Sequence, residues 1–251
     1  DRDELRLLYQ PKFHAPAGPV IGFEALLRWQ HPKQGLLSPD LFLPLAEKTG
    51  LIIPIGNWVI DEACRQLREW HLQGHTDWSM AVNLSTLQFE QPSLVKTVLD
   101  CLTRHSVPPG MLILEVTETT AMSNPDESVR VLTALTDAGV KASIDDFGTG
   151  YSSLLYLKRL PACELKIDRA FVKELSGESE DATIVSAIIA LAKTLNLKVV
   201  AEGVETAAQQ TFLTELGCNT LQGYLLGKPI TAQAIMEQCQ HGEISPSRMQ
   251  S

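Results

Sequence analysis

The sequence lacks several features that would identify whole classes of protein. It has no secretory signal pattern and no run of about 18 apolar residues, so neither a leader peptide nor a membrane-spanning helix is expected within it. The cysteines are scattered and odd in number, and neither a C-x-x-C pair nor a His/Cys cluster suggests a zinc site. We therefore expect reduced thiols and a cytoplasmic location, with any membrane attachment supplied by other parts of a longer parent protein.

Basic residues are scarce as well. The chain has 21 Lys and Arg against 30 Asp and Glu, which gives a formal net charge of −9. Such a chain is poorly suited to hold long nucleic acid, because that binding depends on neutralising phosphates. A small anionic ligand remains compatible with this charge if a metal ion reverses the local field.

What the sequence does contain is a repeated alternation of short apolar runs with helical patterns. The chain has 251 residues, begins without an initiator Met and contains no Gly/Ser/Pro linker. We expect one domain over residues 1–251, excised from a longer protein, with a core at about 5–240 and a frayed tail at 241–251. Eight apolar runs are strand candidates: Leu5–Gln10, Val20–Leu27, Ser79–Leu84, Met111–Val116, Val140–Asp145, Cys163–Ile167, Lys198–Ala201 and Thr220–Leu225.

Helix signals fall between these runs. Asn124 followed by Pro125 predicts a helix start, and Thr206 with Gln209 predicts a capping box. An apolar stripe at helical spacing consists of Ile184, Ile188, Leu191 and Leu195. Eight strands with intervening helices predict a TIM-type (β/α)8 barrel, and an open doubly wound sheet is the competing fold.

The barrel is favoured because polar residues recur at the ends of many separate strands: Glu24, Asn83, Glu115, Asp145 with Asp146, Lys166 with Asp168, Glu202 and Gln222. One polar strand end is ordinary, but in a barrel the carboxyl ends of the strands meet at one mouth. Several carboxylates with an amide oxygen form the hard oxygen shell that suits Mg²⁺ or Mn²⁺. Two such ions can stabilise the attacking and leaving oxygens of a phosphoryl displacement.

Two further features remain open at this point. Lys166 and Asp168 share one face of their strand, where the lysine can orient water or form a structural ion pair with Asp168. Glu118 can reach sideways to brace the loop of residues 146–153, whose glycines suit either a lid or a plain turn.

The motifs follow one another over residues 5–235 in this order: Tyr9-Gln10-Pro11, Glu24-Ala25-Leu26-Leu27-Arg28-Trp29, Phe42-Leu43-Pro44-Leu45-Ala46-Glu47, Asn83-Leu84-Ser85, Glu115-Val116-Thr117-Glu118, Asp145-Asp146-Phe147-Gly148, Leu165-Lys166-Ile167-Asp168, Ala201-Glu202-Gly203-Val204-Glu205 and Gln222-Gly223-Tyr224. In this order they resemble the EAL-domain family, the cyclic-di-GMP phosphodiesterases. The resemblance implies a (β/α)8 barrel with its first strand antiparallel, and hydrolysis of cyclic di-GMP to linear pGpG in bacterial signalling and biofilm control. It also implies a homodimer.

Residue roles are carried over from the same resemblance. It implies two ions, Mg²⁺ or Mn²⁺, with Ca²⁺ inhibitory. The first ion would be held by Glu24, Asn83, Glu115 and Asp145, and the second by Asp145, Asp146 and Glu202. Lys166 would position the attacking water, and Glu118 would anchor the loop. Glu205 would contact the ligand residues rather than the ions themselves. The substrate contacts would be Gln10, Arg28, Asp168 and Gln222.

Two other functions compete with this one. The first is a cyclic-di-GMP receptor with little or no turnover, although relatives of that kind typically lack the motif glutamate or one of the paired aspartates, which this chain keeps. The second is a Mg²⁺-dependent lyase or an aldolase that uses Lys166 as a base or Schiff-base former.

Overall fold

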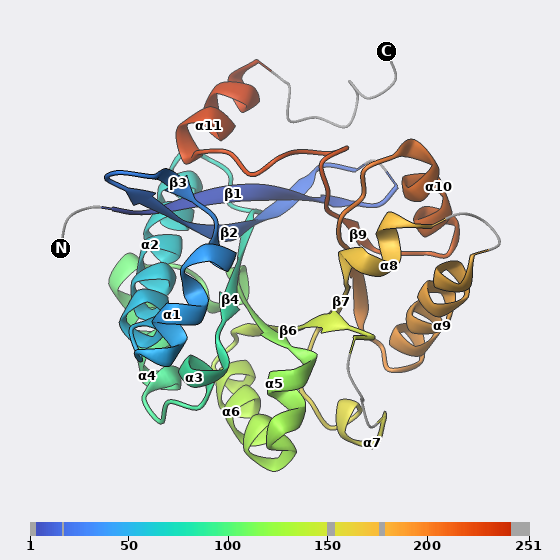
Figure 1. Cartoon of the computed structure of the whole chain (residues 1–251), viewed down its shortest axis with the longest axis horizontal. Coiled ribbons are helices and arrows are strands. Elements are labelled where there is room, and N and C mark those ends of the chain that lie inside the picture. Colours follow the sequence, from blue (N-terminus) through green and yellow to red (C-terminus); the bar gives the residue numbers. More distant parts are fainter. Residues whose placement is uncertain (1–3, 17, 150–153, 176–178, 242–251) are drawn as a thin grey trace.

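The computed structural model describes residues 4–16, 18–149, 154–175 and 179–241. Its strands form a closed ring with the longer helices α2, α4, α6, α9 and α10 outside it (Figure 1). The strands of the ring are β1 (Leu5–His14), β2 (Val20–His31), β4 (Ser79–Leu84), β5 (Leu112–Thr117), β6 (Lys141–Phe147), β7 (Glu164–Ile167), β8 (Lys198–Ala201) and β9 (Thr220–Leu221). The short strand β3 (Gly35–Leu37) pairs with the outer end of β2 and stands outside the ring.

The ring closes through β1, which pairs antiparallel with both β2 and β9. The other neighbours in the ring, from β2 and β4 round to β8 and β9, pair in parallel. The predicted TIM-type barrel with an antiparallel first strand is therefore confirmed, and the open doubly wound sheet is wrong. Because β1 runs against the other strands, its later residues lie deeper in the barrel than its earlier ones.

From β3 onward helices lie between successive strands, and the last helix follows β9. They are α1 (Leu43–Lys48), α2 (Ile52–Leu72), α3 (Thr86–Phe89), α4 (Leu94–His105), α5 (Glu118–Ser123), α6 (Pro125–Asp137), α7 (Leu154–Leu157), α8 (Arg169–Lys173), α9 (Glu180–Thr194), α10 (Ala207–Glu215) and α11 (Ala232–Gln240), with the 3₁₀ turns Pro39–Leu41 and Pro109–Met111. Within the described residues, no helix has the length and apolar character that crossing a membrane requires. All five cysteines are free thiols, as expected.

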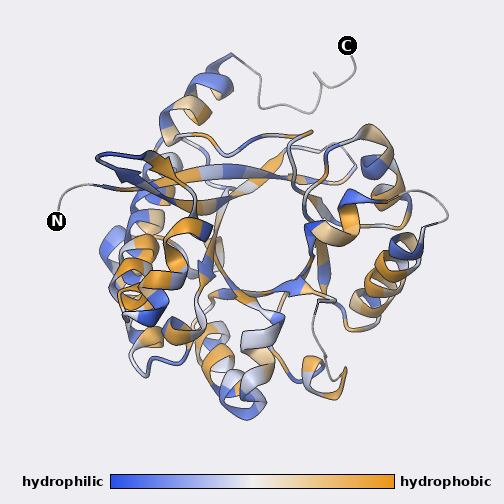
Figure 2. Ribbon diagram, in the orientation of Figure 1, coloured by the Kyte–Doolittle hydropathy of each residue, from blue (hydrophilic) through white to orange (hydrophobic). Residues whose placement is uncertain are grey.

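The apolar core lies between the strands and the helices. Phe23, on the outward face of β2, packs its ring against Trp70 of α2 and against Trp78, with centroids 4.8 Å apart in both pairs. Strand neighbours alternate in direction, so Glu24 next to Phe23 points into the ring. Hydrophilic residues recur along the strands of the ring (Figure 2), and the barrel interior is polar where most barrels are filled by apolar side chains.

Local sequence signals predicted the helix ends well. The side chain of Asn124 caps α6, whose first residue is Pro125, and Thr206 and Gln209 form the complete capping box of α10.

The predicted apolar stripe of α9 is wrong in part, because Ile184 is exposed. The buried face consists of Ala182, Val185, Ile188, Ile189 and Ala192. Two alanines belong to this buried face, and a pattern of large apolar residues alone does not reveal them.

Several strand boundaries also differ from the prediction: β2, for example, continues past Leu27 to His31, and β6 continues past Asp145 to Phe147. Strand β1 continues past Gln10 to His14, because the buried Lys12 stays within the β1–β2 ladder instead of ending the strand. Strand β9 ends at Leu221, since the backbone turns at Gly223, where a Cβ would lie 2.1 Å from the carbonyl oxygen of Val204. The predicted frayed tail lies outside the described residues from position 242 onward.

Candidate active site and metal centre

A cavity of about 330 Å³ opens at the carboxyl ends of the parallel strands. Ten of the residues singled out in the sequence line it: Gln10, Glu24, Arg28, Asp145, Asp146, Lys166, Asp168, Glu202, Glu205 and Gln222. They come from β1, β2, β6 and β7 and from the segments that follow β7, β8 and β9. The barrel closure thus brings together side chains that are up to about two hundred positions apart in the sequence.

Asp145 and Asp146 both face this cavity although they are neighbours in a strand. In a regular strand their side chains would point in opposite directions. The β6–β7 register shifts between Ile144 and Phe147, and Asp146 adopts a left-handed backbone with φ of 53°. This bulge turns the second carboxylate to the same side as the first, and the Asp146 amide donates to Oδ1 of Asp145 at 2.9 Å.

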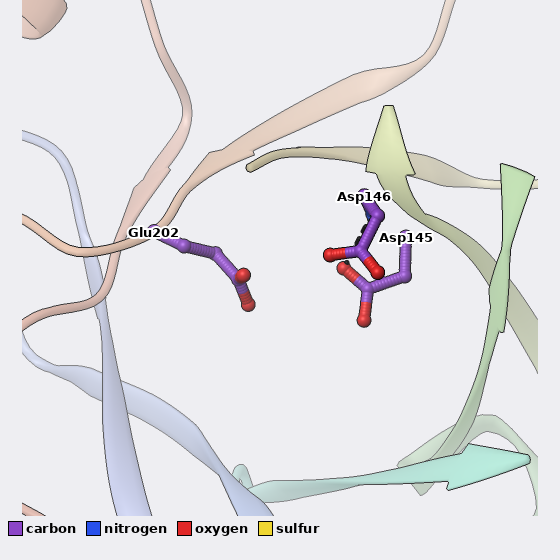
Figure 3. Close-up of side chains that lie close together, drawn as sticks. All are labelled: Asp145, Asp146 and Glu202. Carbon is purple, nitrogen blue, oxygen red and sulfur yellow. Dashed lines mark hydrogen bonds between the residues drawn. The ribbon is translucent and has the colours of Figure 1, made fainter. Parts of the chain in front are cut away.

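Glu202 completes a three-carboxylate cluster with this pair. It follows β8 and extends toward the aspartates across the opening (Figure 3). One oxygen from each of the three side chains lies within 4.8 Å of the other two. That spacing suits three oxygen ligands of one divalent cation.

Lys166 lies at the centre of the acidic residues. Its ammonium donates to Oε2 of Glu115 at 2.6 Å and to Oδ2 of Asp145 at 3.1 Å, and it lies 2.6 Å from Oε1 of Glu202. The structural ion pair with Asp168 that the sequence left open is therefore wrong. Asp168 instead caps α8 by accepting a hydrogen bond from the Ala170 amide.

Glu24 is held by two amide side chains. Asn83 donates from Nδ2 to Oε1 of Glu24 at 2.6 Å, and Gln222 donates from Nε2 to Oε2 at 2.6 Å. Gln222 also donates to Oε1 of Gln10 at 3.2 Å. These bonds link β1, β2, β4 and the end of β9 at the mouth. Asn83 itself does not line this cavity, but it does line the adjoining one, which also reaches Asp146.

Burial and mutual repulsion make it costly to ionise all of these carboxylates. Burial, with the nearby charges of Asp145 and Asp168, raises the pKa of Asp146 to about 7. Burial raises the pKa of Glu202 to about 8, against the lowering effect of Lys166. Burial likewise raises the pKa of Glu24 and of Asp145. The site therefore disfavours further negative charge, and a divalent cation among these oxygens would remove the penalty. The donor set fits a hard cation.

Besides Asn83, two predicted residues lie outside the lining of the cavity. Glu115 is 1% exposed and sits beneath the mouth. Its pKa is lowered because Lys166 and Lys12 outweigh the effect of burial. Glu118, at the start of α5, accepts a hydrogen bond at 2.8 Å from the amide of Gly148, so it contacts the loop that it was expected to brace. Residues 150–153 of that loop lie outside the described part of the chain.

The sequence interpretation missed several residues of this region. Leu26, Arg169, Gly203, Gly223, Tyr224 and Pro229 also line the cavity. Lys12 and Glu164 lie buried below it, joined by an ion pair of 3.1 Å. A signal for both existed: Lys12 interrupts an apolar run, and Glu164 stands two residues before Lys166, on the same strand face.

Comparisons with known proteins bear on this site. The sequence model of the family described as EAL domain matches residues 1–229. The chain is 64% identical over 236 residues to the bifunctional diguanylate cyclase/cyclic di-GMP phosphodiesterase MucR of Pseudomonas aeruginosa, covering 94% of this chain and 34% of MucR. It is 47% identical to the cyclic di-GMP phosphodiesterase NbdA of the same organism, covering 94% of this chain and 30% of NbdA.

A solved structure described as the PaMucR phosphodiesterase in complex with c-di-GMP superposes with a TM-score of 0.91 at 65% identity, covering 93% of this chain and 95% of that one. The FimX EAL domain of Pseudomonas aeruginosa bound to c-di-GMP gives a TM-score of 0.83 at 28% identity, covering 91% of each chain. The chain spans about a third of the length of the curated relatives that it matches.

Proposed function

The chain belongs to the EAL domain family, and from this premise we propose that it is a cation-dependent phosphodiesterase that hydrolyses cyclic di-GMP to linear pGpG. The observation that carries the proposal is the cluster of carboxylates around Lys166 at the barrel mouth. The names of the relatives MucR and NbdA support the same substrate, as does the solved c-di-GMP complex of a 65% identical chain.

The charge of the interior supports two cations. Eight carboxylates lie in the ring or at its mouth, together with two lysines and two arginines, which leaves a formal charge of −4 when every group is ionised. The carboxylates are Glu24, Glu115, Asp145, Asp146, Glu164, Asp168, Glu202 and Glu205, and the cationic side chains are Lys12, Arg28, Lys166 and Arg169. Two divalent cations carry the balancing charge. We propose Mg²⁺ or Mn²⁺ as these ions, with Ca²⁺ inhibitory because it prefers looser, larger coordination.

In the proposed reaction the residues of the chain would hold the cations, orient the attacking water and stabilise developing charge. Asp145, Asp146 and Glu202 would hold one cation, and Glu24, Asn83, Glu115 and Asp145 would hold the other. When bound, such ions would lower the pKa of a water and stabilise the charge on the attacking and leaving oxygens. The ammonium of Lys166 would orient the attacking water.

The outer part of the cavity suits a cyclic dinucleotide. Arg28 and the unpredicted Arg169 supply positive charge at the rim for phosphate. Gln10, Gln222 and Asp168 supply polar groups for the sugar and base edges. Glu205 lines the same rim, where we propose that it supports the ligand residues. Glu118 restrains the start of the loop through the amide of Gly148.

The aldolase alternative fits this geometry poorly. A Schiff base needs a neutral amine. Burial lowers the pKa of Lys166, but the carboxylates of Glu115, Glu202, Glu24 and Asp145 outweigh burial and hold the pKa well above its ordinary value. The lysine therefore stays an ammonium ion, which suits a role in orienting water and stabilising charge.

The experiment is product analysis of cyclic di-GMP incubated with the protein in Mn²⁺, Mg²⁺, Ca²⁺ or EDTA. We expect pGpG with Mn²⁺ or Mg²⁺ and little product in the other two conditions. Glu202→Gln should lower the rate by at least about two orders of magnitude, the size expected when one transition-state stabiliser is lost. Asp100→Asn, at an exposed carboxylate of α4, is the matched control and should keep full activity.

Full activity in EDTA would rule out the cation-dependent mechanism. Binding of cyclic di-GMP without any pGpG in Mn²⁺ would favour the receptor alternative instead.

We further propose a homodimer acting in the cytoplasm. Light scattering of the purified protein with and without cyclic di-GMP tests the dimer, and a monomer in both states would contradict it.

A further inference from the structure

A second lysine lies buried beneath the mouth, outside the proposed reaction. Lys12 of β1 is 2% exposed. Its ammonium donates to Oε1 of Glu164 at 3.1 Å and to Oε1 of Glu115 at 3.3 Å. Lys12, Glu164 and Glu115 are all absent from the lining of the cavity at the mouth. A buried ion pair of this kind costs desolvation energy, so a purely stabilising role is weak grounds for its presence.

The strand directions explain how the pair meets. Along β7, which runs toward the mouth, Glu164 stands two residues before Lys166 on the same face and therefore lies deeper. Along β1, which runs away from the mouth, Lys12 stands two residues after Gln10 and also lies deeper. The antiparallel first strand thus delivers an ammonium to the same depth as Glu164.

Glu115 connects this lower pair with the mouth. Its Oε2 accepts from Lys166 at 2.6 Å, and its Oε1 accepts from Lys12. Lys166 is shared with Asp145 and Glu202, whose surroundings change when cations bind. The contact with Lys12 involves neither of those carboxylates. Burial lowers the pKa of Lys12, but Glu164 and Glu115 outweigh burial and raise it, so Lys12 remains an ammonium ion.

We propose that Lys12, itself held by Glu164, is a positioning residue that fixes the Glu115 carboxylate from below and keeps it aimed for cation binding at the mouth. The inference rests on the proposed function in one respect, namely that Glu115 serves as a ligand. Residues that orient metal ligands typically contribute about 10- to 100-fold to metal affinity.

Positioning and bulk charge predict opposite results, which makes the proposal testable. Removing a positive charge from an acidic interior should tighten the binding of a divalent cation if charge alone matters. If Lys12 positions Glu115, its removal should weaken that binding. The double variant Lys12→Met/Glu164→Gln removes one charge of each sign at nearly constant volume, so it avoids leaving two buried carboxylates without their lysine.

The experiment compares the double variant with Glu164→Gln alone, which keeps the Lys12–Glu115 contact. Mn²⁺ binding to the metal-stripped proteins is measured by titration calorimetry. We expect the double variant to bind Mn²⁺ at least about tenfold more weakly than Glu164→Gln. The Mn²⁺ concentration for half-maximal hydrolysis should rise by a similar factor, and the rate at saturating Mn²⁺ should largely recover.

A control separates this effect from general destabilisation. His71→Leu removes a buried hydrogen bond, from the imidazole to the Trp78 carbonyl, remote from the barrel mouth. It should lower the unfolding temperature without changing Mn²⁺ affinity.

Equal or tighter Mn²⁺ binding by the double variant than by Glu164→Gln would overturn the role of Lys12. If the wild type binds Mn²⁺ but leaves cyclic di-GMP intact, the proposed function fails while the binding comparison still decides the role of Lys12.

Discussion

At the scale of single residues, the backbone next to the paired aspartates is as specialised as their side chains. Asp146 has a positive φ of 53°, and Gly148, two residues later, has a φ of 100°. The Gly148 amide donates to Glu118, so this backbone conformation ties the start of the loop to α5. Residues other than glycine are strained at such a positive φ.

We predict that Gly148→Ala lowers both stability and activity. A Cβ at this position would lie 3.0 Å from Cε2 of Phe171 and 3.2 Å from Cδ1 of Ile188, in addition to the backbone strain. The expected loss is more than about 1 kcal/mol in the free energy of unfolding, measured by urea denaturation. Hydrolysis of cyclic di-GMP should fall further than stability explains, because the hydrogen bond to Glu118 shifts.

Gly74 offers the matched control for this variant. It has a similar φ of 102°, but a Cβ there would meet no atom within 4 Å. Gly74→Ala should therefore carry the backbone cost alone and leave the rate of hydrolysis unchanged. Equal activity of the two variants would show that the conformation at Gly148 does not serve the site.

At the scale of the elements, α10 depends on its first turn. Thr206 accepts from the Gln209 amide, and the Gln209 side chain accepts from the amides of Thr206 and Glu205. Gln209 also donates to the carbonyls of Val172 and Lys173 in the last turn of α8. The cap thus fixes the segment that leads away from Glu202 and joins two neighbouring helices.

We predict that Thr206→Ala lowers the free energy of unfolding by about 1 kcal/mol, the usual cost of losing an N-cap hydrogen bond. Chemical denaturation measures it. Thr211→Ala, at an exposed position inside the same helix, should be close to neutral because alanine is the better helix former. Similar losses in both variants would contradict a specific role for the cap.

At the scale of the whole molecule, the uncompensated negative charge of the interior links stability to cation binding. A ligand that binds only the folded chain stabilises it by about 2.7 kcal/mol at a hundredfold excess over Kd. For a chain of this size each kcal/mol shifts Tm by roughly 2–4 °C. We therefore predict that saturating Mn²⁺ raises Tm by several degrees over the EDTA-treated protein.

Differential scanning fluorimetry measures this shift. Asp145→Asn should largely remove it, since that carboxylate belongs to the three-oxygen cluster and also contacts Lys166. Asp100→Asn should retain it. An unchanged Tm of the wild type in Mn²⁺ would contradict cation binding at the barrel mouth.

The sequence alone determined the features that depend on local patterns and on the order of motifs. Short apolar runs predicted the eight strands of the barrel, and Asn124 and Thr206 predicted the helix caps that the structure has. Polar residues at the strand ends predicted a shared mouth, because parallel strands in a closed barrel end on one side. The roles of those residues as metal ligands and substrate contacts stay predictions that the experiments above address.

Tertiary structure alone decided what depends on depth and direction within the ring. The bulge at Asp146 turns two neighbouring carboxylates to one side, which a strict two-residue alternation would forbid. Lys166 pairs with Glu115, 51 positions away, and with Asp145 and Glu202, whereas its neighbour in sequence, Asp168, caps a helix. Lys12 meets Glu164 because β1 runs against the other strands. These pairings follow from the three-dimensional register of separate strands, since the distance between two charges in the folded barrel does not depend on their separation along the chain.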